Sequence, residues 1–261
     1  MIPKRLHYVW VGCKLPDKQR AFIDTWQKTN PDFELVEWNE NNINMKLPAI
    51  ARAYARQRWS TVADIARLIA VYEQGGIYLV TDFQVYRPLG SLLSQRCFFV
   101  FQHETHPTDW VANGVFGAEA RHPFIGKAIS EVLQIRPLPL GLERPTKYGP
   151  KLITRLLREE GLQHYSPEGV QMGDIFIYPK TVFFPFAYGE EFSDNRITDD
   201  TLAAHFWEKS WIKDILQGAD VIPSSTTSPT AVLLCACPDK DHKQTRDQRM
   251  AQQGLCKGNF V

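Results

Sequence analysis

The stretch "STVADIARLIAVYEQGGIYLVTDF", residues 60–83, decides the fold that this sequence predicts. Apolar residues recur at helical spacing along its first part, and two consecutive glycines then end the helix. Ser60 or Thr61 can cap the start of this helix. An apolar strand follows and runs out to a single acid, Asp82. A helix that leads directly into a buried strand is typical of a sheet with crossover helices.

The segments before this stretch extend the same pattern. Residues 5–12, "RLHYVWVG", are predicted as a first buried strand, and residues 17–30 as a helix that ends at "NP". Residues 33–40, "FELVEWNE", are predicted as a second strand, and residues 49–59 as a short helix. The chain therefore opens as β-α-β, which predicts an α/β fold with a mostly parallel central sheet.

The rest of the chain predicts further elements and then changes character. The elements are a strand with a turn at 77–89, a strand at 96–103, a strand, turn and helix within 112–133, a helix at 150–160, an extended segment at 174–186 and a closing segment at 203–211. Beyond about residue 220 the composition becomes that of a linker. We expect one domain over residues 1–220, and a linker with a polar C-terminal tail over residues 221–261.

Composition limits the classes of function. The chain has 261 residues, of which 44% are hydrophobic, and a formal net charge of +1. This is enough for one sizeable core, and it gives no field that would attract nucleic acid. No run of about eighteen apolar residues predicts a membrane span, and the N-terminus does not resemble a signal peptide. The five cysteines are odd in number, so reduced thiols in the cytoplasm are expected.

Acidic and basic side chains near the central strand are the first candidate site residues. Asp64 and Arg67 lie three positions apart and so face the same way on one helix. They form either a surface ion pair or a polar pair beyond the carboxyl ends of the strands, where parallel sheets bind ligands. Asp82 is either a metal ligand or an acid that caps a turn. Val80 shares its side of the strand, because side chains alternate.

Aromatic residues are the second group of candidates. Trp10, at the end of the first strand, is either a core residue or a platform on which a ring can stack. The segment "HFWEKSW", residues 205–211, contains His205, Trp207, Ser210 and Trp211. His205 is either a hydrogen-bonded structural residue or part of a lid over a sugar.

The tail offers two weaker candidates. A zinc site could be imagined from Cys235, Cys237, His242 and Cys256, although their spacing matches no common ligand pattern. A peripheral membrane contact could use Lys240, Lys243, Arg246 and Arg249. Acids interleaved with these bases weaken the membrane interpretation.

Five segments occur in the order seen in family 32 glycosyltransferases, which this sequence resembles. They are "IPKRLHYVWVG", "FIDTWQKTNP", "FELVEWNE", "ADIARLIAVYEQGGIYLVTDFQVYRPL" and "ANGVFGAEARHP". The likeness covers residues 1–125 and resumes at residues 205–211. That family includes bacterial polysaccharide-assembly transferases and yeast α-mannosyltransferases. A more distant likeness extends to the glucosyltransferase domains of large glucosylating toxins.

The resemblance implies a GT-A fold and a retaining hexosyltransferase that uses a nucleotide-sugar donor, with a UDP-sugar favoured over a GDP-sugar. It implies a divalent metal, Mn²⁺ or Mg²⁺. The acceptor would be a saccharide or a lipid-linked saccharide in polysaccharide assembly, in the cytoplasm or at the inner face of the membrane. No nucleic-acid partner is expected.

The resemblance also implies roles for the candidate residues. Trp10 corresponds to the tryptophan that stacks on the donor base. Asp64 and Arg67 correspond to the D-x-x-R pair that grips the donor sugar and its diphosphate. Asp82 corresponds to the second acid of the DxD motif, which is the direct metal ligand. These three charged residues are the implied catalytic set.

Further residues are implied around the donor. Asn113 and Gly114 fall where the family lines the sugar and acceptor side. His205 is implied as a second metal ligand. The element that closes over the diphosphate corresponds to Trp207, Ser210 and Trp211.

Val80 departs from the family pattern, because the first acid of DxD usually stands at this position. Three explanations are open: an enzyme with weakened metal affinity, a nucleotide-sugar-binding relative that has lost catalysis, or a substitution made to trap a donor complex. The toxin likeness adds a further alternative, an effector that glycosylates a host protein. Valine is a strong strand former, so the fold tolerates it.

Overall fold

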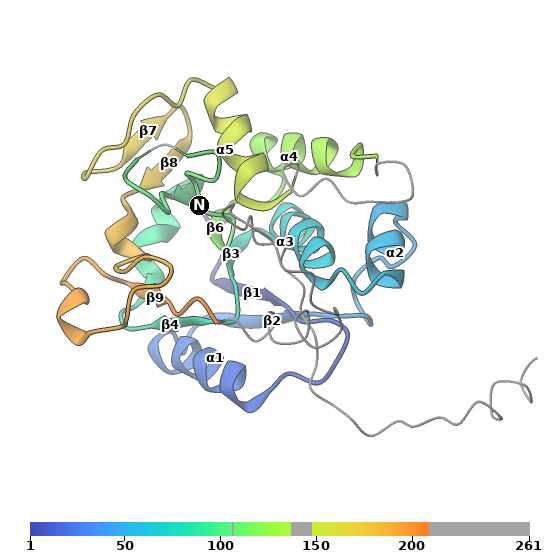
Figure 1. Ribbon diagram of the computed structural model, residues 1–261, viewed down its shortest axis with the longest axis horizontal. Helices are drawn as coiled ribbons and strands as arrows, with labels where there is room; N and C mark the ends of the chain where they lie inside the picture. The colour runs from blue at the N-terminus through green and yellow to red at the C-terminus, as the bar shows by residue number, and fades with distance from the viewer. Residues whose placement is uncertain (106, 137–147, 209–261) are drawn as a thin grey trace, which may run out of the picture.

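The computed structural model describes residues 1–105, 107–136 and 148–208 (Figure 1). A seven-stranded sheet has the order β2-β1-β3-β6-β5-β8-β7, and β4 pairs with β9 in a two-stranded sheet. The strands are β1 (Arg5–Val9), β2 (Glu34–Trp38), β3 (Gly76–Leu79), β4 (Phe83–Val85), β5 (Cys97–Val100), β6 (Val115–Ala118), β7 (Val170–Met172), β8 (Ile175–Tyr178) and β9 (Ala203–His205). The α-helices are α1 (Asp17–Thr29), α2 (Pro48–Ala55), α3 (Trp59–Gln74), α4 (Pro123–Leu133) and α5 (Gly149–Glu159).

Strand directions follow from the pairings. Strand β1 is parallel to β2 and β3, and β5 is parallel to β8. Strand β6 is antiparallel to both β3 and β5, and β7 is antiparallel to β8. Five strands of the large sheet (β1, β2, β3, β5 and β8) therefore run one way, and β6 and β7 run the other. The α/β architecture with a mostly parallel central sheet, predicted for a GT-A fold, is confirmed.

Side-chain alternation divides the interior into two cores, one on each face of the large sheet. Along β3, Ile77 and Leu79 pack with α1 on one face, and Tyr78 packs with α3 on the other. Figure 1 shows α2, α3, α4 and α5 on one side of the sheet, and α1 with the β4–β9 pair on the other. Both faces of the sheet are covered, which is why the central strands β3, β5 and β6 are buried at every position.

Several predicted boundaries differ from the structure. Helix α3 begins at Trp59 after Arg58, and no side-chain cap is present, so the prediction of a Ser60 or Thr61 cap is wrong. The backbone N–H of Arg58 bonds to the carbonyl of Ala53 at the end of α2. This tight connection starts α3 before its first hydroxyl residue.

The predicted strand at 77–89 is two strands in two different sheets. A turn separates β3 from β4, in which the N–H of Phe83 donates to the carbonyl of Val80 at 3.2 Å. The short strand β7 was not predicted, because its three residues, Val170–Met172, are half-buried or exposed.

The cysteine expectation is wrong in one respect. Cys97 is a buried free thiol, whereas Cys13 is disulfide-bonded. An odd count excludes the pairing of all five cysteines, but it does not exclude the pairing of some.

The predicted boundary at residue 220 and the zinc and membrane candidates in the tail lie outside the described residues, so these stay predictions. Within the described ranges, no helix combines the length and the hydropathy needed to cross a membrane.

Candidate active site

The candidate residues gather where β1 and β3 end. Trp10 follows β1, and Asp82 lies in the turn after β3. Because β6 is antiparallel to β3, Asn113 just before β6 lies at the same edge. Helix α3 runs back across the sheet into β3, so its beginning, with Asp64, also lies there. Ligands of α/β sheets bind at this edge.

Arg67 is the centre of the first group. Its Nε donates to the carbonyl of Ala63 at 3.0 Å, and its Nη1 donates to the carbonyl of Asn113 at 2.9 Å. Its Nη2 lies 3.2 Å from Oδ1 of Asp64, and its guanidinium lies 4.7 Å from the centroid of the Tyr78 ring. The side chain is only 8% exposed. The alternative of a surface ion pair is therefore wrong.

Asp64 has one anchored oxygen and one available oxygen. Its Oδ1 contacts Arg67 and accepts a hydrogen bond from Nδ2 of Asn113 at 2.8 Å. Its Oδ2 makes no hydrogen bond to the described part of the chain, and the side chain keeps 17% exposure. Burial raises the pKa of Asp64, although Arg67 and Asn113 oppose the rise. The available oxygen can accept a hydrogen bond from a ligand hydroxyl.

Asp82 and His205 form the second group. Nε2 of His205 lies 3.0 Å from Oδ1 of Asp82, and the backbone N–H of Glu208 donates to Oδ2 at 2.9 Å. The pairing of Phe83 with His205 in the β4–β9 sheet brings the two residues together. Burial alone would raise the pKa of Asp82, but the charge and hydrogen bond of His205, with the Glu208 N–H, outweigh burial and lower it. Asp82 is therefore held ionised.

The Asp82–His205 pair fits a divalent metal. Nε2 of His205 and Oδ1 of Asp82 lie 3.0 Å apart in a hydrogen bond, so a cation that displaced the shared proton would meet both atoms. The donors are a carboxylate oxygen and an imidazole nitrogen, both usable by such ions. Among the described residues no group of three or more His, Cys, Asp or Glu could hold a metal. The described part of the chain therefore offers two candidate ligands, Asp82 and His205.

The two groups meet at Val80. Its N–H donates to the carbonyl of Gly114 at 2.8 Å, and its Cγ1 lies 3.3 Å from where a Cβ on Gly114 would stand. Gly114 follows Asn113 of the first group, and Val80 lies two residues before Asp82 of the second. The half-buried side chain of Val80 also packs against both cores.

Trp10 and Trp207 lie on the same core as Val80, the core beside α1. Trp10 is half-buried, and its Nε1 is buried with no partner among the described residues. The Trp207 ring packs edge-on against His205 with centroids 4.3 Å apart, and its Nε1 donates to the carbonyl of Phe186 at 3.3 Å. Trp207 therefore supports His205 directly. Ser210 and Trp211 lie outside the described residues.

Two features of the site were missed from the sequence. The contact of Glu208 with Asp82 is made by the backbone N–H of Glu208, so the residue type at position 208 could not have predicted it. Gly149, the first residue of α5, lies against Asp64 and Asn113 with φ +59°. The sequence "YGPK", a glycine and proline at the start of a predicted helix, could have indicated an unusual backbone there.

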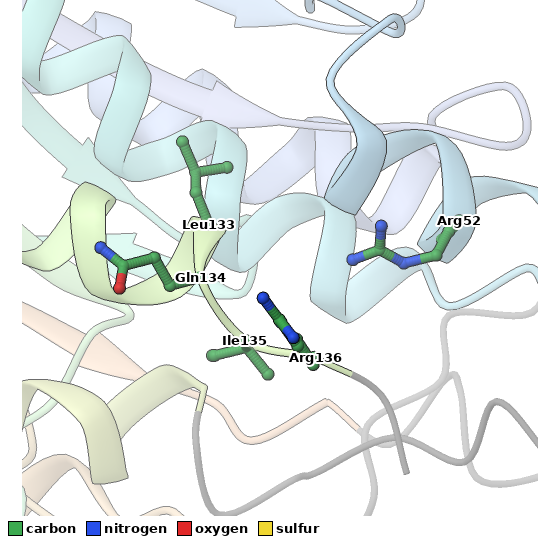
Figure 2. Close-up of a pocket in the computed structure, with 5 residues that line it drawn as sticks. All are labelled: Arg52, Leu133, Gln134, Ile135 and Arg136. Atoms are coloured by element: carbon green, nitrogen blue, oxygen red, sulfur yellow. The ribbon is translucent and has the colours of Figure 1, made fainter. Parts of the chain in front are cut away.

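A pocket of about 500 Å³ lies away from these residues. Figure 2 shows Arg52 on α2 facing the chain that leaves α4. The described residues that line it are Arg52, Leu133, Gln134, Ile135 and Arg136. None of these is a predicted site residue.

Comparison with known proteins supports the glycosyltransferase interpretation. Residues 16–99 match the family described as "Glycosyltransferase sugar-binding region containing DXD motif", a range that contains both Asp64 and Asp82. Inositol phosphoceramide mannosyltransferase 3 of Schizosaccharomyces pombe is 30% identical over 133 residues, covering 48% of this chain and 35% of that protein. The human alpha-1,4-N-acetylglucosaminyltransferase is 27% identical over 164 residues, covering 61% and 42%.

A bacterial relative and two solved structures add to these likenesses. The Subversion of eukaryotic traffic protein A of Legionella pneumophila is 27% identical over 129 residues, covering 36% of this chain and 20% of that protein. The PaToxG glycosyltransferase has a TM-score of 0.48 at 20% identity, covering 61% and 70%. The galactosyltransferase LgtC has a TM-score of 0.43 at 12% identity, covering 84% and 97%. At these TM-scores the structural likeness carries no argument.

The chain spans less than half the length of these three curated relatives, so its own activity, donor and acceptor are matters for a proposal. The resemblance to DxD glycosyltransferases is nevertheless confirmed, because residues 16–99 match the family model of a glycosyltransferase sugar-binding region that contains a DXD motif.

Proposed function

We propose that this chain is a metal-dependent, retaining glycosyltransferase that moves a sugar from a nucleotide-sugar donor to a saccharide or lipid-linked acceptor. The contact between Asp82 and His205 carries this proposal. An acid inside the family region meets a histidine 123 residues later, at the sheet edge where ligands bind. The pair places one carboxylate oxygen and one imidazole nitrogen side by side, and divalent metals accept both kinds of donor.

The chemistry places two demands on the chain. Transfer breaks the bond between the anomeric carbon and the diphosphate, so negative charge grows on the leaving phosphate while the sugar becomes oxocarbenium-like. Arg67 places a permanent positive charge beside the sugar region, and its three contacts leave two of about five guanidinium N–H groups for a phosphate. Oδ2 of Asp64 accepts a hydrogen bond from a sugar hydroxyl and so orients the ring.

Asp82 and His205 hold the metal in this proposal, with Mn²⁺ preferred and Mg²⁺ as the alternative. When bound, the ion would neutralise charge on the diphosphate, which is worth several kcal/mol. Asp82 is ready for this role because its lowered pKa keeps it ionised. The edge-on packing of Trp207 keeps the His205 ring in place.

The acceptor and the location belong to the same proposal. Relatives are named for inositol phosphoceramide and lactosylceramide, which supports a lipid-linked acceptor for this chain as well. We propose action in the cytoplasm at the inner face of the membrane, with a UDP-sugar ahead of a GDP-sugar as donor.

A second candidate function is favoured by Val80, which offers no oxygen to a cation or a ribose. In this alternative the protein binds a nucleotide-sugar and does not turn it over. A third candidate, glycosylation of a host protein, draws on the name of the Legionella relative.

Isothermal titration with UDP- and GDP-sugars, with and without Mn²⁺, tests the proposal. We expect Mn²⁺-dependent binding that falls at least tenfold in Asp82→Asn, because the change removes a charged ligand. Asp199→Asn is the matched control, since Asp199 is fully exposed and should leave binding unchanged. Binding followed by donor hydrolysis or transfer supports the enzyme, and binding with no turnover supports the second candidate. If no nucleotide-sugar in the panel binds, both the enzyme and the nucleotide-sugar-binding candidate are rejected.

A further inference from the structure

We propose that Gly149 is a specificity-determining residue: its bare Cα forms one wall of the donor-sugar subsite, and the missing side chain admits a sugar hydroxyl to Oδ2 of Asp64. This inference rests on the proposed function and names the residue that selects the sugar. Gly149 lies 85 positions after Asp64 in the sequence, and the fold alone brings them together.

Contacts at Gly149 define the wall. A Cβ added there would stand 3.3 Å from Oδ2 of Asp64, 3.5 Å from Nδ2 of Asn113 and 3.8 Å from Oδ1 of Asn113. These are the three nearest atoms to that position, and all belong to the acid–amide pair of the site. The face of Gly149 that would carry a side chain therefore points at the Asp64 oxygen that makes no hydrogen bond to the described residues.

Oδ2 of Asp64 indicates the role of the space that a side chain at position 149 would fill. Oδ1 of Asp64 is occupied by Asn113 and Arg67, whereas Oδ2 makes no hydrogen bond to the described residues. A hydroxyl that donates to Oδ2 must bring its oxygen to about 2.7 Å. A methyl group at 3.3 Å from the same atom would occupy part of the approach. A glycine therefore keeps open an approach to Oδ2 that no described residue uses and that a ligand hydroxyl could use.

Backbone conformation offers a competing explanation, and the chain contains a control for it. Gly149 has φ +59°, a conformation that favours glycine whatever surrounds it. Gly173, in the turn between β7 and β8, has φ +57°, and a Cβ there would meet nothing within 4 Å. Alanine at the two positions imposes the same backbone strain, but only alanine at 149 fills space beside Asp64.

The experiment compares Gly149→Ala with Gly173→Ala in the full chain. Each variant is titrated with UDP, with UDP-hexoses and with the corresponding deoxy-sugar donors that lack one hydroxyl each. We expect similar falls in Tm and unchanged UDP affinity in both. Only Gly149→Ala should lose about tenfold or more in affinity for the intact sugar donor, the size expected for a lost hydrogen bond to a charged group.

The deoxy donors identify the hydroxyl. In the unaltered protein one deoxy donor should bind at least tenfold more weakly than its parent sugar, and Gly149→Ala should abolish that difference. If Gly149→Ala and Gly173→Ala show the same donor selectivity, or if Gly149→Ala weakens UDP itself to the same extent, the assignment of Gly149 is overturned while the proposed function stands. If the unaltered protein binds no donor, the proposed function fails and the assignment fails with it.

Discussion

Replacing Arg67 by lysine tests whether the buried guanidinium of Arg67 holds Asp64 and Asn113 in place. Arg67 makes three polar contacts, to the carbonyls of Ala63 and Asn113 and to Asp64, and is almost fully buried. Lysine keeps the charge, but its single nitrogen cannot reach all three partners. Loss of two contacts of about 1.5 kcal/mol each predicts a fall of about 3 kcal/mol in the free energy of unfolding.

Urea denaturation followed by circular dichroism measures this fall. Arg155→Lys is the matched control, because Arg155 pairs with Glu131 and Glu159 but is 39% exposed. The control should cost less than about 1 kcal/mol. Donor affinity should also fall in Arg67→Lys alone, since Asp64 loses an anchor. If the two lysine variants are equally stable, the guanidinium of Arg67 does not hold its three partners in place as proposed.

The remaining predictions concern a missing acid and a buried histidine. Val80→Asp places a carboxylate two residues before Asp82 and should raise metal-dependent donor hydrolysis at least tenfold. Val80→Asn should lose similar stability with no gain in hydrolysis. If neither variant changes the rate of hydrolysis, Val80 does not occupy the position of the first DxD acid as interpreted. His7 is buried between Trp38 and the carbonyl of Gly75, and burial lowers its pKa from 6.5. The unfolded chain therefore binds a proton that the folded chain does not, so the free energy of unfolding should fall below pH 6.5 by up to about 1.4 kcal/mol per pH unit. Urea titrations from pH 7.5 to 5.5 should show this slope reduced by one proton in His7→Gln, and an unchanged slope would refute the assignment.

Local patterns predicted most of the fold. Helix α3 and the start of strand β3 were predicted close to their observed positions, because helical periodicity and two glycines are local signals. The break between β3 and β4 was missed, since the apolar run continues through the turn and only tertiary pairing separates the sheets. The cap at Arg58 depends on a contact with α2, which propensity cannot detect.

The site was predicted in part, for a related reason. Asp64 and Arg67 share a helix face, so their proximity follows from spacing. The approach of His205 to Asp82 came from resemblance alone, because 123 residues separate them. The Glu208 contact is made by backbone, and the approach of Gly149 to Asp64 depends on how α5 packs. Such contacts are properties of the assembled chain and leave no local pattern.

The pairing of β4 with β9 has a consequence for biosynthesis. Asp82 and His205 are brought together by two short strands separated by most of the described chain. A nascent chain synthesised only as far as β8 already contains β3 and Asp82 but does not yet contain the partner histidine. Closing such a long loop requires the intervening segments to have found their places first. The metal site that we propose would thus form only after β9 has been made, and shorter nascent chains could not use it to bind a donor.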